Sequence, residues 1–250
     1  MEILEESKHK KIALLIDGDN AQPSLISQIL AETGKYGSVT IRRIYGDWTK
    51  ANMSGWKDTL NNYAIQPIQQ FRYTIGKNAT DSAMIIDAMD ILHGGMVEGF
   101  CIVSSDSDYT RLATRIRETG IFVMGIGKST TPKAFVNACN VFIYTENLVT
   151  ETKSVEKKQR EKTLKEKSKA VEKFDPIPLL TKAIEMAMQE DGWANLATTG
   201  FYLHQLDPGF DPRTYGHKQL SSLFKSFPEK FELKFQSDTG ITTIFVKMKD

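Results

Sequence analysis

The sequence predicts a three-layer α/β/α sandwich around a parallel sheet, followed by a small winged-helix domain. In the first 150 residues, short β-rich runs alternate with longer segments of helical period, which is the pattern of βαβ units. The last 77 residues instead contain helical segments followed by two strands of alternating pattern. With 250 residues, of which 40% are hydrophobic and 25% charged, the chain can bury a sizeable core.

The elements of the first part follow from local signals. An apolar run at 11–16 predicts a buried strand, Pro23 suits the first turn of the next helix, and Gly34 is placed to end that helix. Pro67 has no N–H to donate, so the strand expected at 65–71 should lie at an edge of the sheet. The other expected strands are 39–45, 99–103, 121–126 and 141–144, and the other expected helices are 53–63, 79–93, 109–119 and a short one after Pro132.

Composition divides the chain into three parts, at 1–150, 151–173 and 174–250. Residues 151–173 contain nine Lys and Arg against five Asp and Glu, with no aromatic residue. This part has too few large apolar residues to bury a helix face, so it is expected to be a charged, helical linker. In the last part, helices are expected at 179–190, 202–206 and 220–227, and strands at 231–235 and 242–246, which is the order of a winged helix.

Several protein classes are excluded by the same composition. The longest apolar runs are about five residues, as at 12–16, whereas a membrane-spanning helix needs roughly 20. The N-terminus lacks the apolar stretch of a signal peptide, so a cytoplasmic location with no membrane partner is expected. Two cysteines, Cys101 and Cys139, provide neither a disulfide framework nor a four-thiolate zinc site.

Acidic residues occur where two of the expected strands end. The first strand leads into Asp17-Gly-Asp-Asn20 and the fourth into Ser104-Ser-Asp-Ser-Asp108, while Asp81 lies near the start of the helix at 79–93. In open parallel sheets, ligands bind outside the carboxyl ends of the strands where the strand order reverses. We therefore expect four carboxylates to converge there: Asp17, Asp81, Asp106 and Asp108. Such a cluster takes up protons or binds a cation, and oxygen ligands favour Mg²⁺ or Mn²⁺.

Each acidic run also has a simpler interpretation. Ser107 and Asp108 are suited to capping the following helix, and Asp17-Gly18 is suited to a turn at the end of a strand. Asp87 is six residues beyond Asp81, about 240° around the helix, so a supporting or surface role is expected for it.

These runs resemble the motifs of bacterial NYN-domain proteins of the LabA-like (DUF88) group, within the PIN-like nucleases. The resemblance covers about residues 11–148 and is carried by the two acidic runs above together with Lys77-Asn-Ala-Thr-Asp81. It implies a PIN-like fold and a divalent-metal pocket that cleaves RNA. By position, it implies metal ligands at Asp17, Asp81, Asp106 and Asp108, with Asp19 and Asn20 lining the same corner.

The last part resembles the OST-HTH or LOTUS domain over roughly 177–247. The resemblance is carried by Asp191-Gly-Trp-Ala-Asn-Leu196 and Leu206-Asp-Pro-Gly-Phe-Asp-Pro-Arg-Thr-Tyr-Gly216. It implies a winged helix that binds RNA or docks a protein partner. Residues 174–250 contain eight Lys and Arg against ten Asp and Glu, so no basic surface decides between these two partners.

The leading hypothesis is a ribonuclease that uses Mg²⁺ or Mn²⁺ to hydrolyse RNA phosphodiester bonds. Ser105 is a further candidate for the pocket, and three cationic residues are candidates for RNA contacts: Lys77, Arg111 and Arg115. One alternative is a phosphatase that forms an aspartyl phosphate at Asp17 with Asp19 as acid and base, although Ala21 replaces the Thr or Val usual in that motif. Another is an RNA-binding adaptor without catalysis.

Overall fold

The computed structural model describes residues 10–71, 79–149, 175–238 and 241–249. The chain forms two compact units, Met1–Thr152 and Lys153–Asp250, each with its own core. The charged segment 151–173 and Lys77 lie outside the described residues. Among the helices that the structure describes, none has the length and apolarity needed to cross a membrane.

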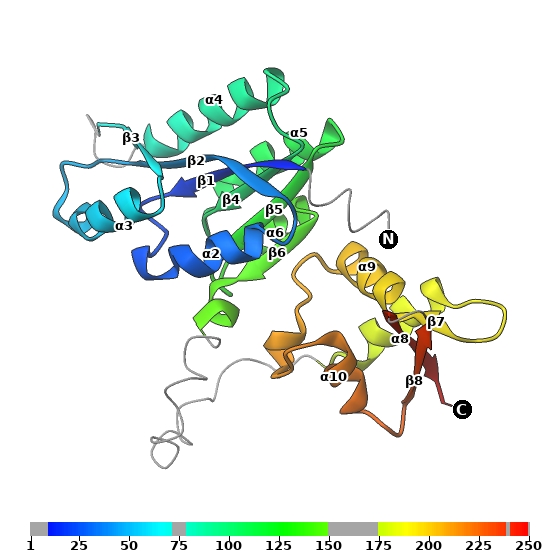
Figure 1. Ribbon diagram of the computed structural model, residues 1–250. Coiled ribbons are helices and arrows are strands. Elements are labelled where there is room, and N and C mark those ends of the chain that lie inside the picture. Colours follow the sequence, from blue (N-terminus) through cyan, green and yellow to red (C-terminus); the bar gives the residue numbers. More distant parts are fainter. Residues whose placement is uncertain (1–9, 72–78, 150–174, 239–240, 250) are drawn as a thin grey trace, which may run out of the picture. The chain divides into compact units, whose positions relative to one another are not determined.

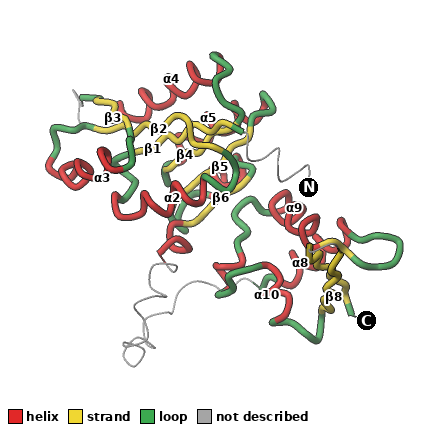
Figure 2. The backbone as a smooth tube through the Cα atoms, viewed as in Figure 1, coloured by secondary structure: helices red, strands yellow, loops and turns green. Residues whose placement is uncertain are grey.

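The first unit is built on a six-stranded sheet in which every neighbouring pair is parallel. Figure 2 shows its strands in yellow among the red helices of this unit. Its strands are β1 (Lys11–Asp17), β2 (Ser38–Gly46), β3 (Gln66–Gln69), β4 (Gly99–Val103), β5 (Phe122–Gly127) and β6 (Val141–Tyr144). The strand order is β3-β2-β1-β4-β5-β6. Strands β2 and β3 therefore lie on one side of β1, and β4, β5 and β6 lie on the other, so the strand order reverses between β1 and β4. The rim beside the ends of β1 and β4 is the point at which a ligand site is expected.

Helices cover both faces of this sheet (Figure 1). Successive side chains of a strand point to opposite faces, so Leu15 packs on one side and Leu14 on the other. One face is covered by α4 (Ala79–His93), α5 (Thr110–Glu118) and α6 (Lys133–Ala138). The other is covered by α2 (Ile26–Thr33), the 3₁₀ segment Ala51–Trp56 and α3 (Lys57–Asn62). This arrangement confirms the predicted three-layer α/β/α sandwich.

Element boundaries differ from the expected ones in a few places. The first helix begins as a 3₁₀ turn at Pro23–Leu25, and Gly34 caps its end. The third strand is shorter than expected, at Gln66–Gln69. It lies at the sheet edge and contains Pro67, as predicted, because an edge strand needs no hydrogen bond from every N–H.

The second unit is a small winged helix. It contains α8 (Ile177–Ala187), α9 (Leu196–Leu206), α10 (Leu220–Lys225) and the antiparallel pair β8 (Phe231–Asp238) and β9 (Ile241–Met248). A short strand, β7 (Ala194–Asn195), pairs with β9 and was not predicted, because two residues carry no periodic signal. Phe224 of α10 packs edge-on against Phe231 of β8, which ties the helices to the sheet.

Candidate active site

The predicted acidic residues lie around the carboxyl ends of β1 and β4. Asp17 is the last residue of β1, Asp106 and Asp108 lie just after β4, and Asp81 lies in the first turn of α4. The two strands are neighbours in the sheet. Residues that are far apart in sequence therefore come together at the point where the strand order reverses.

Three of these carboxylates form a compact group. Oxygen atoms of Asp81, Asp106 and Asp108 all lie within 4.8 Å of one another. Asp106 and Asp108 lie on one short loop, in which Asp106 Oδ1 accepts a hydrogen bond of 2.9 Å from the backbone N of Asp108. Asp106 therefore caps the 3₁₀ turn Ser107–Tyr109 while it faces Asp81. Like charges at this separation repel one another, so the group favours a bound cation.

Asp17 lies deeper than the other three aspartates, with no exposed surface. Its Oδ2 accepts hydrogen bonds from Asn20 Nδ2 at 2.6 Å and Ser104 Oγ at 2.9 Å, and its Oδ1 accepts one from the backbone N of Asp19 at 3.1 Å. Burial raises the pKa of Asp17 above its ordinary value, and the charge of Asp81 adds to this rise. These three donors keep the carboxylate in one orientation at the floor of the site.

Ser104 is a supporting residue that the sequence analysis did not select. Its hydroxyl donates to Asp17 and accepts a hydrogen bond of 3.0 Å from the backbone N of Asp106, so it joins the ends of β1 and β4. Ser105, which was selected, instead accepts a hydrogen bond from the backbone N of Lys128. Strand alternation was the available signal, because Ser104 follows Ile102 by two residues and Asp17 follows Leu15 by two, and Ile102 and Leu15 pack on the same face of the sheet.

Tyr109 is a second residue of this kind. Its buried hydroxyl donates a hydrogen bond of 2.7 Å to Asp81 Oδ1. Burial, followed by the charges of Asp17, Asp81 and Asp106, raises its pKa far above the ordinary tyrosine value. The hydroxyl therefore remains protonated and remains a donor to Asp81.

Replacing Tyr109 with Phe should weaken Mn²⁺ binding by about 10- to 100-fold, the usual cost of losing a group that orients a metal ligand. The ring stays in the core, so the free energy of unfolding should change little. Calorimetric titration with Mn²⁺ measures the loss. Tyr63→Phe, on a distant segment of the same unit, is the matched control. Equal Mn²⁺ affinity in wild type and Tyr109→Phe would show that this hydrogen bond does not orient Asp81.

The remaining predicted residues have varied positions. Asp19 is exposed and reaches Asp17 through its backbone N–H. Arg111 and Arg115 are exposed on α5, where Arg115 pairs with Glu118 at 3.5 Å. Asp87 accepts hydrogen bonds from Arg43 and Tyr45 of β2. These bonds hold α4, the helix that carries Asp81, against the sheet, so Asp87 has a supporting role.

The raised pKa of Asp17 predicts how pH affects the metal-free protein. The folded state holds the Asp17 proton to a higher pH than the unfolded state, so this residue lowers the free energy of unfolding as pH rises above 3.8. A cation that binds the ionised site restores stability, by about 2.7 kcal/mol at 100 times its Kd. Thermal unfolding with and without Mn²⁺ should therefore show a larger stabilisation at neutral than at acidic pH. Equal stabilisation at both pH values would contradict this expectation.

The donor set fits a hard divalent cation. All the candidate ligand atoms are carboxylate oxygens, which suit Mg²⁺ or Mn²⁺ and disfavour the softer metals that bind to thiolate or imidazole. The group is also accessible from solvent, since Asp108 is exposed and Asp81 and Asp106 are partly exposed. Acidic residues at the switch point of a three-layer α/β/α sandwich agree with the PIN-like, nuclease-type class that the sequence motifs predicted.

Comparison with known families agrees with this class. Residues 11–148 match the NYN domain and residues 171–242 match the OST-HTH/LOTUS domain. The chain therefore belongs to the NYN-domain family and carries a C-terminal OST-HTH/LOTUS domain, as the sequence motifs predicted. NYN is a nuclease-type domain, and an OST-HTH/LOTUS domain indicates RNA binding.

Two solved structures are similar to parts of the chain. A protein of unknown function from Vibrio parahaemolyticus is 17% identical, with 54% of this chain and 91% of that chain covered and a TM-score of 0.46. An uncharacterised protein from Nitrosomonas europaea is 30% identical, with 36% of this chain and 90% of that chain covered and a TM-score of 0.28. No curated protein matches the chain.

Proposed function

We propose that the protein is a divalent-metal-dependent ribonuclease that hydrolyses phosphodiester bonds at its aspartate cluster. The observation that carries this proposal is the convergence of Asp81, Asp106 and Asp108, with oxygens within 4.8 Å, at the switch point of an NYN domain. The RNA-binding character of the OST-HTH/LOTUS domain supports RNA as the substrate.

The aspartates have distinct roles in this proposal. Asp81, Asp106 and Asp108 hold one or two Mg²⁺ or Mn²⁺ ions, and Asp17, the fourth ligand expected from the sequence, lies outside this group of three and supports it from the buried floor. The bound ion supplies a water of lowered pKa and neutralises charge that develops on the phosphate. Asn20 and Ser104 keep Asp17 oriented, and Tyr109 does the same for Asp81.

RNA contacts are assigned to cationic residues near the cluster. Arg111 is exposed in the first turn of α5, three residues after Asp108, and is placed to contact the RNA backbone. Arg115 lies one turn further along the same helix, and Lys77 precedes Asp81 in the sequence. Removal of any one of them is expected to weaken RNA binding with little effect on metal binding.

The division of labour follows the predicted domains. Residues 1–150 contain every proposed metal ligand, and 174–250 form the domain that selects or retains RNA, with 151–173 as the connection. A protein partner is the alternative ligand of the C-terminal domain. A protein partner is favoured if removal of the C-terminal domain leaves the affinity of the chain for RNA unchanged.

The phosphatase alternative is disfavoured by burial. An aspartyl phosphate requires the substrate to reach Asp17, whose side chain is fully buried and accepts three hydrogen bonds. The adaptor alternative has the same RNA contacts but predicts no cleavage.

The direct test is to incubate the purified chain with end-labelled RNAs in Mn²⁺, Mg²⁺ or EDTA. Metal-dependent fragments that EDTA abolishes are expected, with 5′-phosphate and 3′-hydroxyl ends as the family resemblance implies. RNA that is bound but remains intact with either metal would instead support the adaptor. Phosphate release from a small phosphoester, with a phosphorylated Asp17, would support the phosphatase.

A further inference from the structure

A pocket adjoins the aspartate cluster on the α2 side of the sheet rim. Asn20 and Ser104 line this pocket, and both also donate hydrogen bonds to Asp17. Leu25 and Ile126 of the α2-side core form part of its wall. The pocket therefore borders Asp17 through these two side chains. Asp81 lies on the α4 side of the sheet and Leu25 of the pocket on the α2 side.

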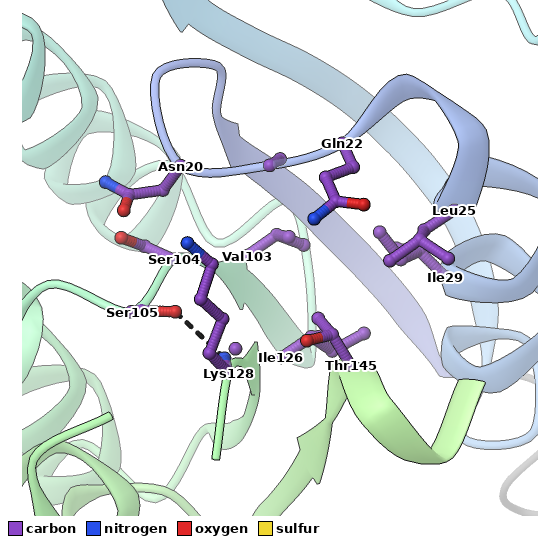
Figure 3. A pocket seen from close by; sticks show the side chains of 12 residues that line it. Asn20, Gln22, Leu25, Ile29, Val103, Ser104, Ser105, Ile126, Lys128 and Thr145 are labelled. Carbon is purple, nitrogen blue, oxygen red and sulfur yellow. Dashed lines mark hydrogen bonds between the residues drawn. The ribbon is translucent and has the colours of Figure 1, made fainter. Parts of the chain in front are cut away.

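Lys128 and Gln22 reach into this pocket (Figure 3). Lys128 follows the last residue of β5, and it has the one formally charged side chain among the described residues that line the pocket. Within the described parts of the chain, Lys128 makes no ion pair. Its ammonium is therefore available to a ligand, and Gln22 adds an amide that can donate a hydrogen bond.

The backbone around Lys128 is held on both sides. Its N–H donates to Ser105 Oγ at 2.9 Å, and its carbonyl oxygen accepts from Thr131 Oγ1 at 2.7 Å. The next residue, Ser129, donates from its backbone N and its hydroxyl to Glu146. Burial alone would raise the pKa of Glu146, but these hydrogen bonds lower it, so the carboxylate stays ionised and fastens the loop. These hydrogen bonds hold the backbone of Lys128 in one position beside the pocket.

The negative charge of this rim gives a cationic side chain a role in an RNA-cutting site. Five aspartates lie at or beside the cluster, and without metal they repel a polyanion. Lys128 and Gln22 are both exposed side chains of this pocket, so a phosphate at the pocket would pair with the ammonium of Lys128 without displacing an ion-pair partner. Asn20 and Ser104 line the pocket and also bond to Asp17, so an RNA strand lying across the rim would reach both the pocket and the aspartates.

We propose that this pocket is a phosphate-binding subsite for the RNA strand being cut, with Lys128 as its cation and Gln22 as a neutral donor. This inference rests on the proposed ribonuclease function. The bound group is an RNA phosphate next to the cleaved bond, either within the strand or at its 5′ end. Lys128 acts on substrate position and affinity, and the aspartates act on the bond that breaks.

The test is lysine footprinting on the full-length Asp106→Asn chain, which is expected to cut RNA too slowly to shorten it during the experiment. The chain is acetylated with and without saturating single-stranded RNA in Mg²⁺, and each lysine is quantified by mass spectrometry. RNA should slow acetylation of Lys128 several-fold and leave Lys11, at the opposite end of β1, unchanged. If 5′-phosphorylated RNA protects Lys128 and 5′-hydroxyl RNA does not, the pocket binds the terminal phosphate. If both RNAs protect Lys128, the pocket binds an internal phosphate.

A second measurement uses wild type, Lys128→Ala and the matched control Lys11→Ala. Lys128→Ala should raise KM for RNA about tenfold with little change in kcat. It should also reduce the salt dependence of RNA binding by about 0.7 in the slope of log K against log salt, the value for one lost phosphate contact with a single strand. Lys11→Ala should change neither quantity.

The outcomes separate this inference from the proposed function. If RNA is cut but Lys128 is acetylated equally with and without RNA, the subsite is wrong and the ribonuclease stands. If Lys128 is protected but no metal supports cleavage by the wild type, the pocket binds an RNA phosphate, but the ribonuclease and the role of the pocket in cleavage are both wrong.

Discussion

Replacing Asp106 with Asn should reduce metal-dependent RNA cleavage by about 10³-fold or more. A bound divalent ion contributes several kcal/mol of charge stabilisation in the transition state, and each 1.4 kcal/mol corresponds to a factor of ten in rate. Asn keeps the oxygen that accepts the hydrogen bond from Asp108 N, so the 3₁₀ turn and the free energy of unfolding should be preserved. The variant therefore removes a charge from the cluster without removing the cap.

The rate is measured with end-labelled RNA under single-turnover conditions, and metal affinity is measured in parallel with Mn²⁺. Asp90→Asn is the matched control, because Asp90 is an exposed aspartate on α4 away from the cluster. Asp81→Asn should resemble Asp106→Asn, and the double variant should lose little more, because residues that act as one unit are not additive. Wild-type fragments from Asp106→Asn at an unchanged rate would mean that cleavage does not occur at this cluster.

Deleting residues 174–250 should weaken binding of a long RNA by about 10²-fold or more. Two linked binding modules can exceed the affinity of either alone by 10² to 10⁴, and that gain is lost when one module is removed. Cleavage of a short RNA that contacts the first unit alone should retain its kcat, because every proposed ligand is in that unit. The first unit has its own two-sided core, so the shortened chain should fold, which circular dichroism and thermal unfolding can verify.

Affinity for the long RNA is measured by fluorescence anisotropy, with the full-length chain as reference and a variant at a surface residue of the C-terminal unit, Glu229→Gln, as control. Equal affinity of the full-length and shortened chains would assign the C-terminal domain to a protein partner. Loss of cleavage on the short RNA by a folded first unit would contradict the proposed division of labour.

The sequence predicted the succession of strands and helices along the chain well, because most of these elements have a strong local signal. The apolar run of β1 and the edge position given by Pro67 both appear in the structure as expected. The short strand β7 and the 3₁₀ starts of two helical segments were missed, since pairing with β9 and packing against the sheet decide them. Ser104 and Tyr109 were missed as supporting residues for a similar reason, because their partners, Asp17 and Asp81, are distant in sequence.

The sequence by itself determined the fold class, the two families and the identities of the acidic residues, because periodicity and short motifs are properties of neighbouring residues. Tertiary structure decided which acids share a site. It brought Asp81, Asp106 and Asp108 within 4.8 Å and placed Asp17 in the buried floor below them. It also put Lys128 in a pocket beside that floor. These contacts depend on the order of the strands in the sheet and on which face each side chain occupies. Each contact joins residues that are far apart in sequence, so no local pattern predicts it.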